Sequence, residues 1–199
     1  PTVSSPYSGT VTASSVHLYW SRIDNATNYR IDVSTSSSFS SFFSPYNNFA
    51  TPTGSPYAPT EYNITGLSSG TTFYIRVRAE NGAGQSVNSN VVNATTIPSA
   101  PSATAATPID DQSFQANWNA QSGASYYKLY VSPNSGFSSY VSGYNGTTVS
   151  GTSQVVSSLT AGATYYYRLR AVNSFGESGY SNTISTLTGP SVPAISAPT

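Results

Sequence analysis

Few side chains in this 199-residue sequence could support acid–base or nucleophilic chemistry. His17 is the only histidine, cysteine is absent, and Asp, Glu, Lys and Arg together make up 7% of the residues. His17 lies in an alternating segment, on the side opposite the apolar residues, so we expect it at the surface without a designated partner. A serine nucleophile would need a strand–turn–helix elbow, and no helical periodicity supplies one. We therefore expect no catalytic residues and no enzymatic activity.

The sequence also has few residues that could bind a metal or a cofactor. Asp110 and Asp111 are adjacent, and we expect a solvated turn whose carboxylates bond the local backbone. A calcium loop would present several oxygen ligands at regular spacing, and zinc sites draw on Cys and His. No glycine-rich phosphate-binding motif is present. The sequence thus predicts no metal and no cofactor.

The charge balance narrows the set of partners. Seven basic and seven acidic residues cancel, and the charged fraction is far below the usual level of about 25%. Binding to nucleic acid needs a basic surface, so we expect no nucleic acid partner. No apolar run approaches the roughly 20 residues that span a bilayer, so we expect no direct membrane insertion. The uncharged polar surface favours a secreted or cell-surface location, and a chain that lacks Met and begins at Pro1 fits an excised segment.

The sequence contains an internal duplication. Trp20 and Trp118 are separated by 98 residues, whereas Leu67 and Leu159 are separated by 92, so the first copy carries six more residues, between Asn48 and Tyr62. A short joint rich in Pro and Ser lies between the copies. We expect one domain over residues 1–97, a second over 98–190, and a linker over 191–199 toward a possible next module.

Within each copy the apolar residues alternate with polar ones, which predicts short strands with one buried face. In "ATYYYRLRA" (163–171), Tyr165 and Tyr167 should point inward, and Tyr166, Arg168 and Arg170 outward. About seven such strands in each copy indicate a two-sheet sandwich. The expected core residues are Trp20, Trp118, Tyr29, Tyr127, Leu67, Leu159, Phe73 and Tyr165.

These motifs resemble the fibronectin type III family. The resemblance rests on Trp20, "YRIDV" and "LSSGTTFYIRVRAENGAGQS" in the first copy, and on Trp118, "YKLYV" and "LTAGATYYYRLRAVNSFGES" in the second. It implies an all-β fold of two consecutive immunoglobulin-like sandwiches, similar to those of bacterial secreted proteins. The sequence contains no Arg-Gly-Asp tripeptide, so the resemblance implies no integrin site.

The resemblance also implies a tyrosine corner, in which the hydroxyl of Tyr165 bonds the backbone near Leu159. Phe73 occupies the corresponding position of the first copy and has no hydroxyl. We therefore predict that the first domain is the less stable of the two.

Two surfaces are candidates for ligand contact. One is the outward face of the central sheet, where exposed Tyr and Arg side chains could stack on sugars; alternatively, they pair across strands, Asp32 with Arg76. The other is the aromatic segment 40–59, which could instead fold back over the sheet edge. The candidate contact residues are Tyr74, Arg76, Tyr130, Tyr166, Arg168, Phe43, Tyr46 and Tyr57.

We expect a non-catalytic spacer or adhesion module pair from a larger multidomain protein, whose partners are neighbouring domains of the same chain. The alternative is a module that binds polysaccharide or another surface protein through these candidate residues.

Overall fold

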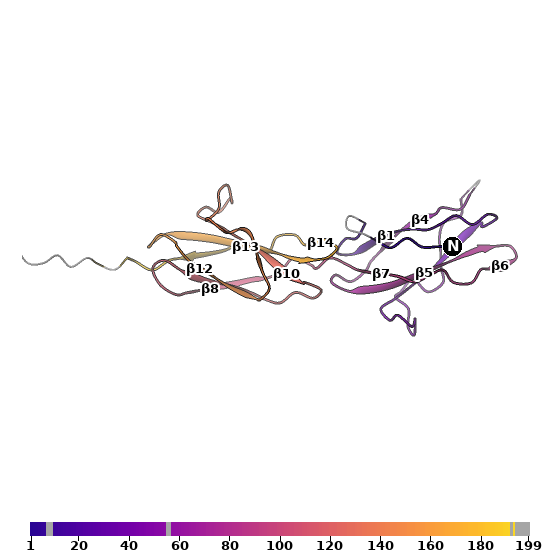
Figure 1. Ribbon diagram of the computed structural model, residues 1–199, viewed down its shortest axis with the longest axis horizontal. Coiled ribbons are helices and arrows are strands. Elements are labelled where there is room, and N and C mark those ends of the chain that lie inside the picture. Colours follow the sequence, from indigo (N-terminus) through magenta and orange to yellow (C-terminus); the bar gives the residue numbers. More distant parts are fainter. Residues whose placement is uncertain (7–9, 55–56, 192, 194–199) are drawn as a thin grey trace, which may run out of the picture. The chain divides into compact units, whose positions relative to one another are not determined.

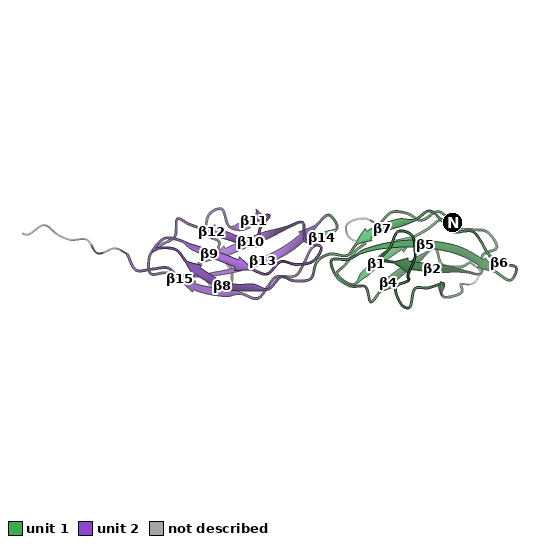
Figure 2. Ribbon diagram, turned by 90° about the horizontal axis from the view of Figure 1, so that it is seen from below, with its two compact units in different colours: residues 1–98, 174–176 green, residues 99–173, 177–199 purple. Residues whose placement is uncertain are grey.

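The computed structural model describes residues 1–6, 10–54, 57–191 and 193, and in this part of the chain it contains strands and no helix (Figure 1). Accordingly, no described helix is long and apolar enough to cross a membrane. The chain divides into two compact units, residues 1–98 with 174–176 and residues 99–173 with 177–199 (Figure 2). The predicted linker 191–199 lies almost entirely outside the described residues.

Unit 1 consists of two antiparallel sheets. The smaller sheet pairs β1 with β4, and isolated bridges join Val3 to Trp20 and Val11 to Val16 beside it. The larger sheet has the order β3-β2-β5-β6, with β7 also paired to β5. The strands are β1 (Ser15–Tyr19), β2 (Asn28–Ser34), β3 (Phe49–Ala50), β4 (Glu61–Thr65), β5 (Thr72–Asn81), β6 (Gly84–Gln85) and β7 (Val92–Thr95).

Unit 2 repeats this plan with a more regular first strand. One sheet has the order β12-β9-β8, and the other has the order β11-β10-β13-β14, with β15 also paired to β13. The strands are β8 (Ala103–Pro108), β9 (Phe114–Trp118), β10 (Tyr126–Ser132), β11 (Asn145–Val149), β12 (Ser153–Val156), β13 (Thr164–Asn173), β14 (Gly176–Glu177) and β15 (Ile184–Leu187). The all-β fold of two immunoglobulin-like sandwiches is thus as predicted.

The alternating sequence pattern decides which side chains are buried. Along both β5 and β13, buried residues alternate with partly exposed ones, because successive side chains of a strand point to opposite faces. Tyr165 and Tyr167 are buried, whereas Tyr166 between them is half-buried on the other face. The predicted separation of this aromatic run into two faces is confirmed.

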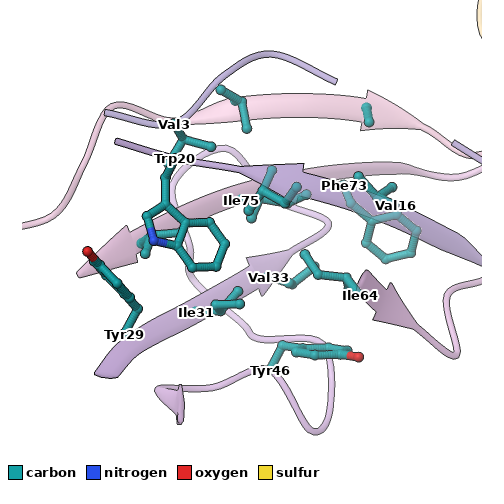
Figure 3. Packing of buried hydrophobic residues seen from close by; sticks show 14 of the residues in the cluster. Val3, Val16, Trp20, Tyr29, Ile31, Val33, Tyr46, Ile64, Phe73 and Ile75 are labelled. Atoms are coloured by element: carbon teal, nitrogen blue, oxygen red, sulfur yellow. The ribbon is translucent and has the colours of Figure 1, made fainter. Parts of the chain in front are cut away.

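Each unit has a core in which a tryptophan packs against a tyrosine. The Trp20 ring lies 5.2 Å from Tyr29, edge to face, and the Trp118 ring lies 5.6 Å from Tyr127 (Figure 3 shows unit 1). Both indoles are at most 5% exposed. Both tyrosine hydroxyls accept a backbone N–H of the preceding loop, at 2.9 Å in unit 1 and 2.7 Å in unit 2. The other expected core residues, Leu67, Leu159, Phe73 and Tyr165, are also buried.

The two cores differ at the position of the tyrosine corner. The hydroxyl of Tyr165 accepts the backbone N–H of Thr160 at 2.9 Å, next to Leu159. In unit 1 the ring of Phe43 instead packs edge-on against Phe73, with the ring centroids 5.1 Å apart. Unit 1 thus replaces the hydroxyl contact with an aromatic pair.

Candidate ligand-binding surface

The outward side of β2 and β5 in unit 1, called the unit 1 face, is organised by ion pairs. The Asp32 carboxylate accepts from Arg76 Nε at 2.9 Å and from Arg78 Nη2 at 3.0 Å. Asp32 also accepts the backbone N–H of Asn48 at 2.8 Å, and its side chain is 2% exposed. Asp32 and Arg76 lie directly opposite each other in the sheet. The expected cross-strand pair is confirmed, and the carboxylate is enclosed by its partners.

A second ion pair extends the unit 1 face. Arg30 Nε donates to the Glu80 carboxylate at 2.7 Å, and Gln85 donates to the other carboxylate oxygen. The hydrogen bond from Arg30 outweighs the opposing effect of burial and lowers the pKa of Glu80 to about 2. Glu80 is therefore ionised across the physiological pH range.

Both units place an arginine of the central strand over a phenylalanine ring. The guanidinium carbon of Arg76 lies 4.1 Å from the Phe39 ring centroid, and that of Arg168 lies 3.9 Å from the Phe137 centroid. Phe39 and Phe137 have the same φ of 54°, an uncommon value for a residue with a side chain. The turn after β2 in unit 1 and the turn after β10 in unit 2 therefore present this ring to the arginine.

The outward side of β10 and β13 in unit 2, called the unit 2 face, has aromatic rings where unit 1 has carboxylate. Tyr130 lies opposite Arg168, in the position that Asp32 holds opposite Arg76. Arg168 lies between two rings, 3.9 Å from Phe137 and 3.8 Å from Tyr180. Its Nε is buried without a hydrogen-bond partner. The guanidinium of Arg168 is thus held by rings rather than by an acid.

The other two cations of the unit 2 face, Lys128 and Arg170, share one carboxylate. Glu177 pairs with Lys128 and, at 3.5 Å, with Arg170, whose guanidinium also lies 3.9 Å from the Tyr180 ring. The hydrogen bond to Glu177 raises the pKa of Lys128. Glu177 pairs with these two cations and makes no ion pair with Arg168.

Tyrosines surround Arg168 on this face. The Tyr130 ring lies 5.3 Å from Tyr180 and 6.1 Å from Tyr140, and Tyr140 lies 6.3 Å from Phe137. Burial, followed by the proximity of Tyr180, raises the pKa of Tyr130, so its hydroxyl stays protonated. Phe137 is buried, whereas the three tyrosines are half-buried and keep part of each ring in solvent.

Two candidate contact residues lie apart from these clusters. Tyr74 and Tyr166 are half-buried, and they lie opposite Ser34 and Ser132 at one end of the paired strands. Tyr166 lies on the same side of β13 as Arg168, two residues away, and can extend the unit 2 face along the strand. Tyr74 lies beside the neutralised arginines of unit 1.

Aromatic residues of the segment 40–59 pack into and against the core of unit 1, and the expectation that Tyr46 contacts a ligand is corrected accordingly. Tyr46 belongs to the core cluster of unit 1 (Figure 3). It is 3% exposed, and its hydroxyl accepts from Thr65 N at 2.8 Å and donates to Thr65 O at 3.2 Å. Phe43 is half-buried against Phe73. These aromatic rings cover the edge of the sandwich, because the sheet is short here and their burial is favourable.

Tyr57 is the candidate of this segment that remains exposed. It is 59% exposed, and the Arg22 guanidinium lies 3.4 Å from its ring centroid. Both residues border a hollow of about 240 Å³, next to the loop before β2.

Phe137 and Tyr180 belong to the unit 2 face but were not among the contact residues predicted from the sequence. Tyr180 lies in the irregular stretch between β14 and β15, where no alternation indicates which side a residue faces. The duplication holds a signal for both: Phe137 matches Phe39, and Tyr180 falls where unit 1 has Asn88. Comparing the copies position by position would have identified Tyr180 as an aromatic residue specific to unit 2.

The polar residues considered for chemistry are involved in local contacts. His17 stacks on Tyr19 and approaches Glu61 with Nε2 and Oε2 3.5 Å apart, so the expectation that it has no partner is corrected. Asp110 accepts from Gln112 N and Ser113 Oγ, both at 2.8 Å, and the backbone bond lowers its pKa. The stretch 66–70 reads Gly-Leu-Ser-Ser-Gly, which has the Gly-x-Ser-x-Gly spacing of a serine nucleophile elbow. It joins strand β4 to strand β5, however, and not a strand to a helix as such an elbow does. Among the described residues, no three His, Cys, Asp or Glu side chains gather as metal ligands.

Two antiparallel sandwiches, each centred on a tryptophan, define the chain as a tandem of immunoglobulin-like domains. The family model of the fibronectin type III domain matches twice, at residues 4–95 and 99–187. The chain belongs to the fibronectin type III family.

Two solved structures are similar to this chain at low sequence identity. The crystal structure of FN3tt is 24% identical and covers 49% of this chain and all of that one, with a TM-score of 0.41. A two-domain fibronectin type III segment of chicken tenascin is 23% identical and covers 94% of this chain and 95% of that one, with a TM-score of 0.46. No curated protein matches the chain.

Proposed function

We propose that this domain pair is a non-catalytic spacer of a larger extracellular protein, and that its partners are neighbouring domains of the same chain. The observation that carries this proposal is the repetition of a complete unit: each unit buries its own aromatic-anchored core between its own antiparallel sheets. Because each unit folds around its own core, each can resist stretching independently of the other. This property suits such units to repetition in a stalk or adhesin. The low charge content supports a secreted or surface protein, as in bacteria.

Stretching the full chain between its termini in a single-molecule instrument tests the mechanical part of this proposal. We expect two separate unfolding events, each releasing about 30 nm of chain, because some 90 residues extend by about 3.3–3.6 Å each. Extension without two such events would contradict a spacer built from two load-bearing units.

A second candidate function is binding of a polysaccharide or another surface protein through the unit 2 face. It is favoured by Arg168, a cation among half-exposed tyrosines, whereas the corresponding arginine of unit 1 is neutralised by Asp32. Pull-down of the full chain on insoluble polysaccharides, compared with the Tyr166→Ala variant, tests this function. Loss of retention in the variant supports binding through β13, and unchanged retention contradicts it.

A further inference from the structure

Arg168 is distinguished from every other basic residue of the chain by its lack of an acidic partner. All seven lysines and arginines lie in the described part, and six of them form ion pairs there. These pairs are Arg22 with Asp24, Arg30 with Glu80, Arg76 and Arg78 with Asp32, and Lys128 and Arg170 with Glu177. Arg168 is therefore the one Lys or Arg side chain of the described residues whose positive charge is not neutralised by an ion pair within the chain.

The surroundings of Arg168 prepare it to bind an anion. The rings of Phe137 and Tyr180 hold the guanidinium from two directions, which fixes its plane without occupying its charge. Its Nε is already buried. An anion that reaches it therefore meets a pre-oriented fork of donors beside apolar surface, where attraction between charges is stronger than in open water.

The distribution of charge in unit 2 also favours an anionic partner. Its three basic residues, Lys128, Arg168 and Arg170, all lie on the unit 2 face, where Glu177 is the acid that pairs with them. The other two acids of the unit, Asp110 and Asp111, lie in the turn between β8 and β9, and Asp110 is engaged by Gln112 and Ser113. Three cations against one carboxylate give the unit 2 face a net positive charge, although the unit as a whole is neutral.

The rest of the surface suits sugar rings better than an extended peptide. β13 is paired with β10 on one side and with β14 and β15 on the other, so it has no free edge for strand addition. Contacts must come from side chains, and Tyr130, Tyr140 and Tyr180 provide half-exposed rings with hydroxyls. Aromatic faces pack against the C–H faces of sugars while hydroxyls exchange hydrogen bonds with them.

We propose that the unit 2 face binds an acidic polysaccharide, with Arg168 holding the carboxylate of a uronic acid unit and the neighbouring tyrosines packing against the sugar chain. This inference rests on the second candidate function above and names its ligand class. It does not depend on the spacer role, because the face lies wholly within one domain.

Titration of the full chain with oligogalacturonate, and with the same oligomers fully methyl-esterified, tests the proposal. The ester keeps the sugar ring and removes the charge. We expect the free acid to bind at least tenfold more tightly than the ester, and its binding to weaken as salt is added. Equal binding of acid and ester would overturn the uronate assignment and leave polysaccharide binding intact. Failure of both probes to bind would overturn the uronate assignment and polysaccharide binding through this face together.

Three variants locate the site. Arg168→Gln removes the free charge and should lower affinity for the acid at least tenfold. Tyr130→Asp places the carboxylate of unit 1 opposite Arg168 and should abolish preference for the acid, with folding checked by melting. Arg22→Gln removes one positive charge at an exposed position of unit 1 and should leave binding unchanged. Equal weakening by Arg22→Gln and Arg168→Gln would show a nonspecific charge effect and overturn the site.

A polyglutamate peptide of similar charge separates the sugar from the carboxylate contribution. We expect it to bind at least tenfold more weakly than oligogalacturonate, because a peptide lacks the rigid ring that packs against tyrosine. Binding of both with equal affinity would overturn the polysaccharide assignment.

Discussion

The same arginine position has two different environments in the two units. Arg76 and Arg168 both point outward from the central strand, and both lie over a phenylalanine ring. In unit 1 the opposite residue is Asp32, which closes a buried ionic cluster; in unit 2 it is Tyr130, and the arginine remains unpaired. One difference on a neighbouring strand therefore decides whether an arginine position that both units share stabilises the sheet or presents a charge to solvent.

This comparison also separates features of the fold from features of an individual unit. Tryptophan, its partner tyrosine and the phenylalanine below the arginine occur in both units. Asp32, Tyr130 and Tyr180 occur in one unit only. The shared residues build the sandwich, and the unshared ones determine what each surface can contact.

The largest expected effect concerns the independence of the two cores. Trp20→Ala should destabilise unit 1 by about 3–5 kcal/mol, because it removes a buried indole and leaves a cavity. The melting transition of unit 2 should remain where it is. Calorimetry of the full chain, with Trp118→Ala as the matched variant, measures both transitions. A single transition that shifts as a whole in either variant would contradict two separate cores.

Removing the acid of the unit 1 face should have the next largest effect. Asp32→Ala leaves two partly buried arginines without a carboxylate and should cost unit 1 about 3 kcal/mol. Tyr130→Ala, its counterpart, should cost unit 2 less, because no buried charge loses its partner. Urea unfolding of both variants measures the difference, and a larger loss for Tyr130→Ala would contradict the ionic interpretation of unit 1.

Much of the fold follows from the sequence because strand alternation is a local property. The period of two correctly indicated the inward and outward sides of β5 and β13, and it paired Asp32 with Arg76. Tyr46 and Tyr180 could not be placed in this way. Both lie in irregular segments, where the direction of a side chain depends on turn geometry and on the surface against which the loop packs.

The tyrosine corner should contribute a smaller difference. Tyr165→Phe removes the hydroxyl that accepts the Thr160 N–H and should destabilise unit 2 by about 0.5–1.5 kcal/mol. The prediction that unit 1 is the less stable domain rests on its lack of this bond. Separate melting of the two transitions, before and after Tyr165→Phe, tests both statements, and a more stable unit 1 in the unaltered chain would contradict the second.

Acid should weaken unit 1 through Glu80. Its folded pKa of about 2 lies below the ordinary value of 4.5, so the unfolded chain takes up the proton first as the pH falls. The stabilisation is therefore complete above pH 4.5 and is lost as the pH approaches 2. Because the pair is partly exposed, we expect a loss of up to about 1 kcal/mol. Melting of the Glu80→Gln variant should lack this part of the pH dependence, and an unchanged profile would contradict the role of Glu80.

The most direct measurement of the difference between the two arginines is the NMR signal of their Nε–H groups. Arg76 Nε–H donates to Asp32 at 2.9 Å, and we expect a downfield proton protected from exchange. Arg168 Nε–H is enclosed between rings without an acceptor, and we expect an upfield proton shifted by the ring currents of Phe137 and Tyr180. Two downfield, carboxylate-bonded signals would contradict the account that Arg168 is the unpaired cation of the chain.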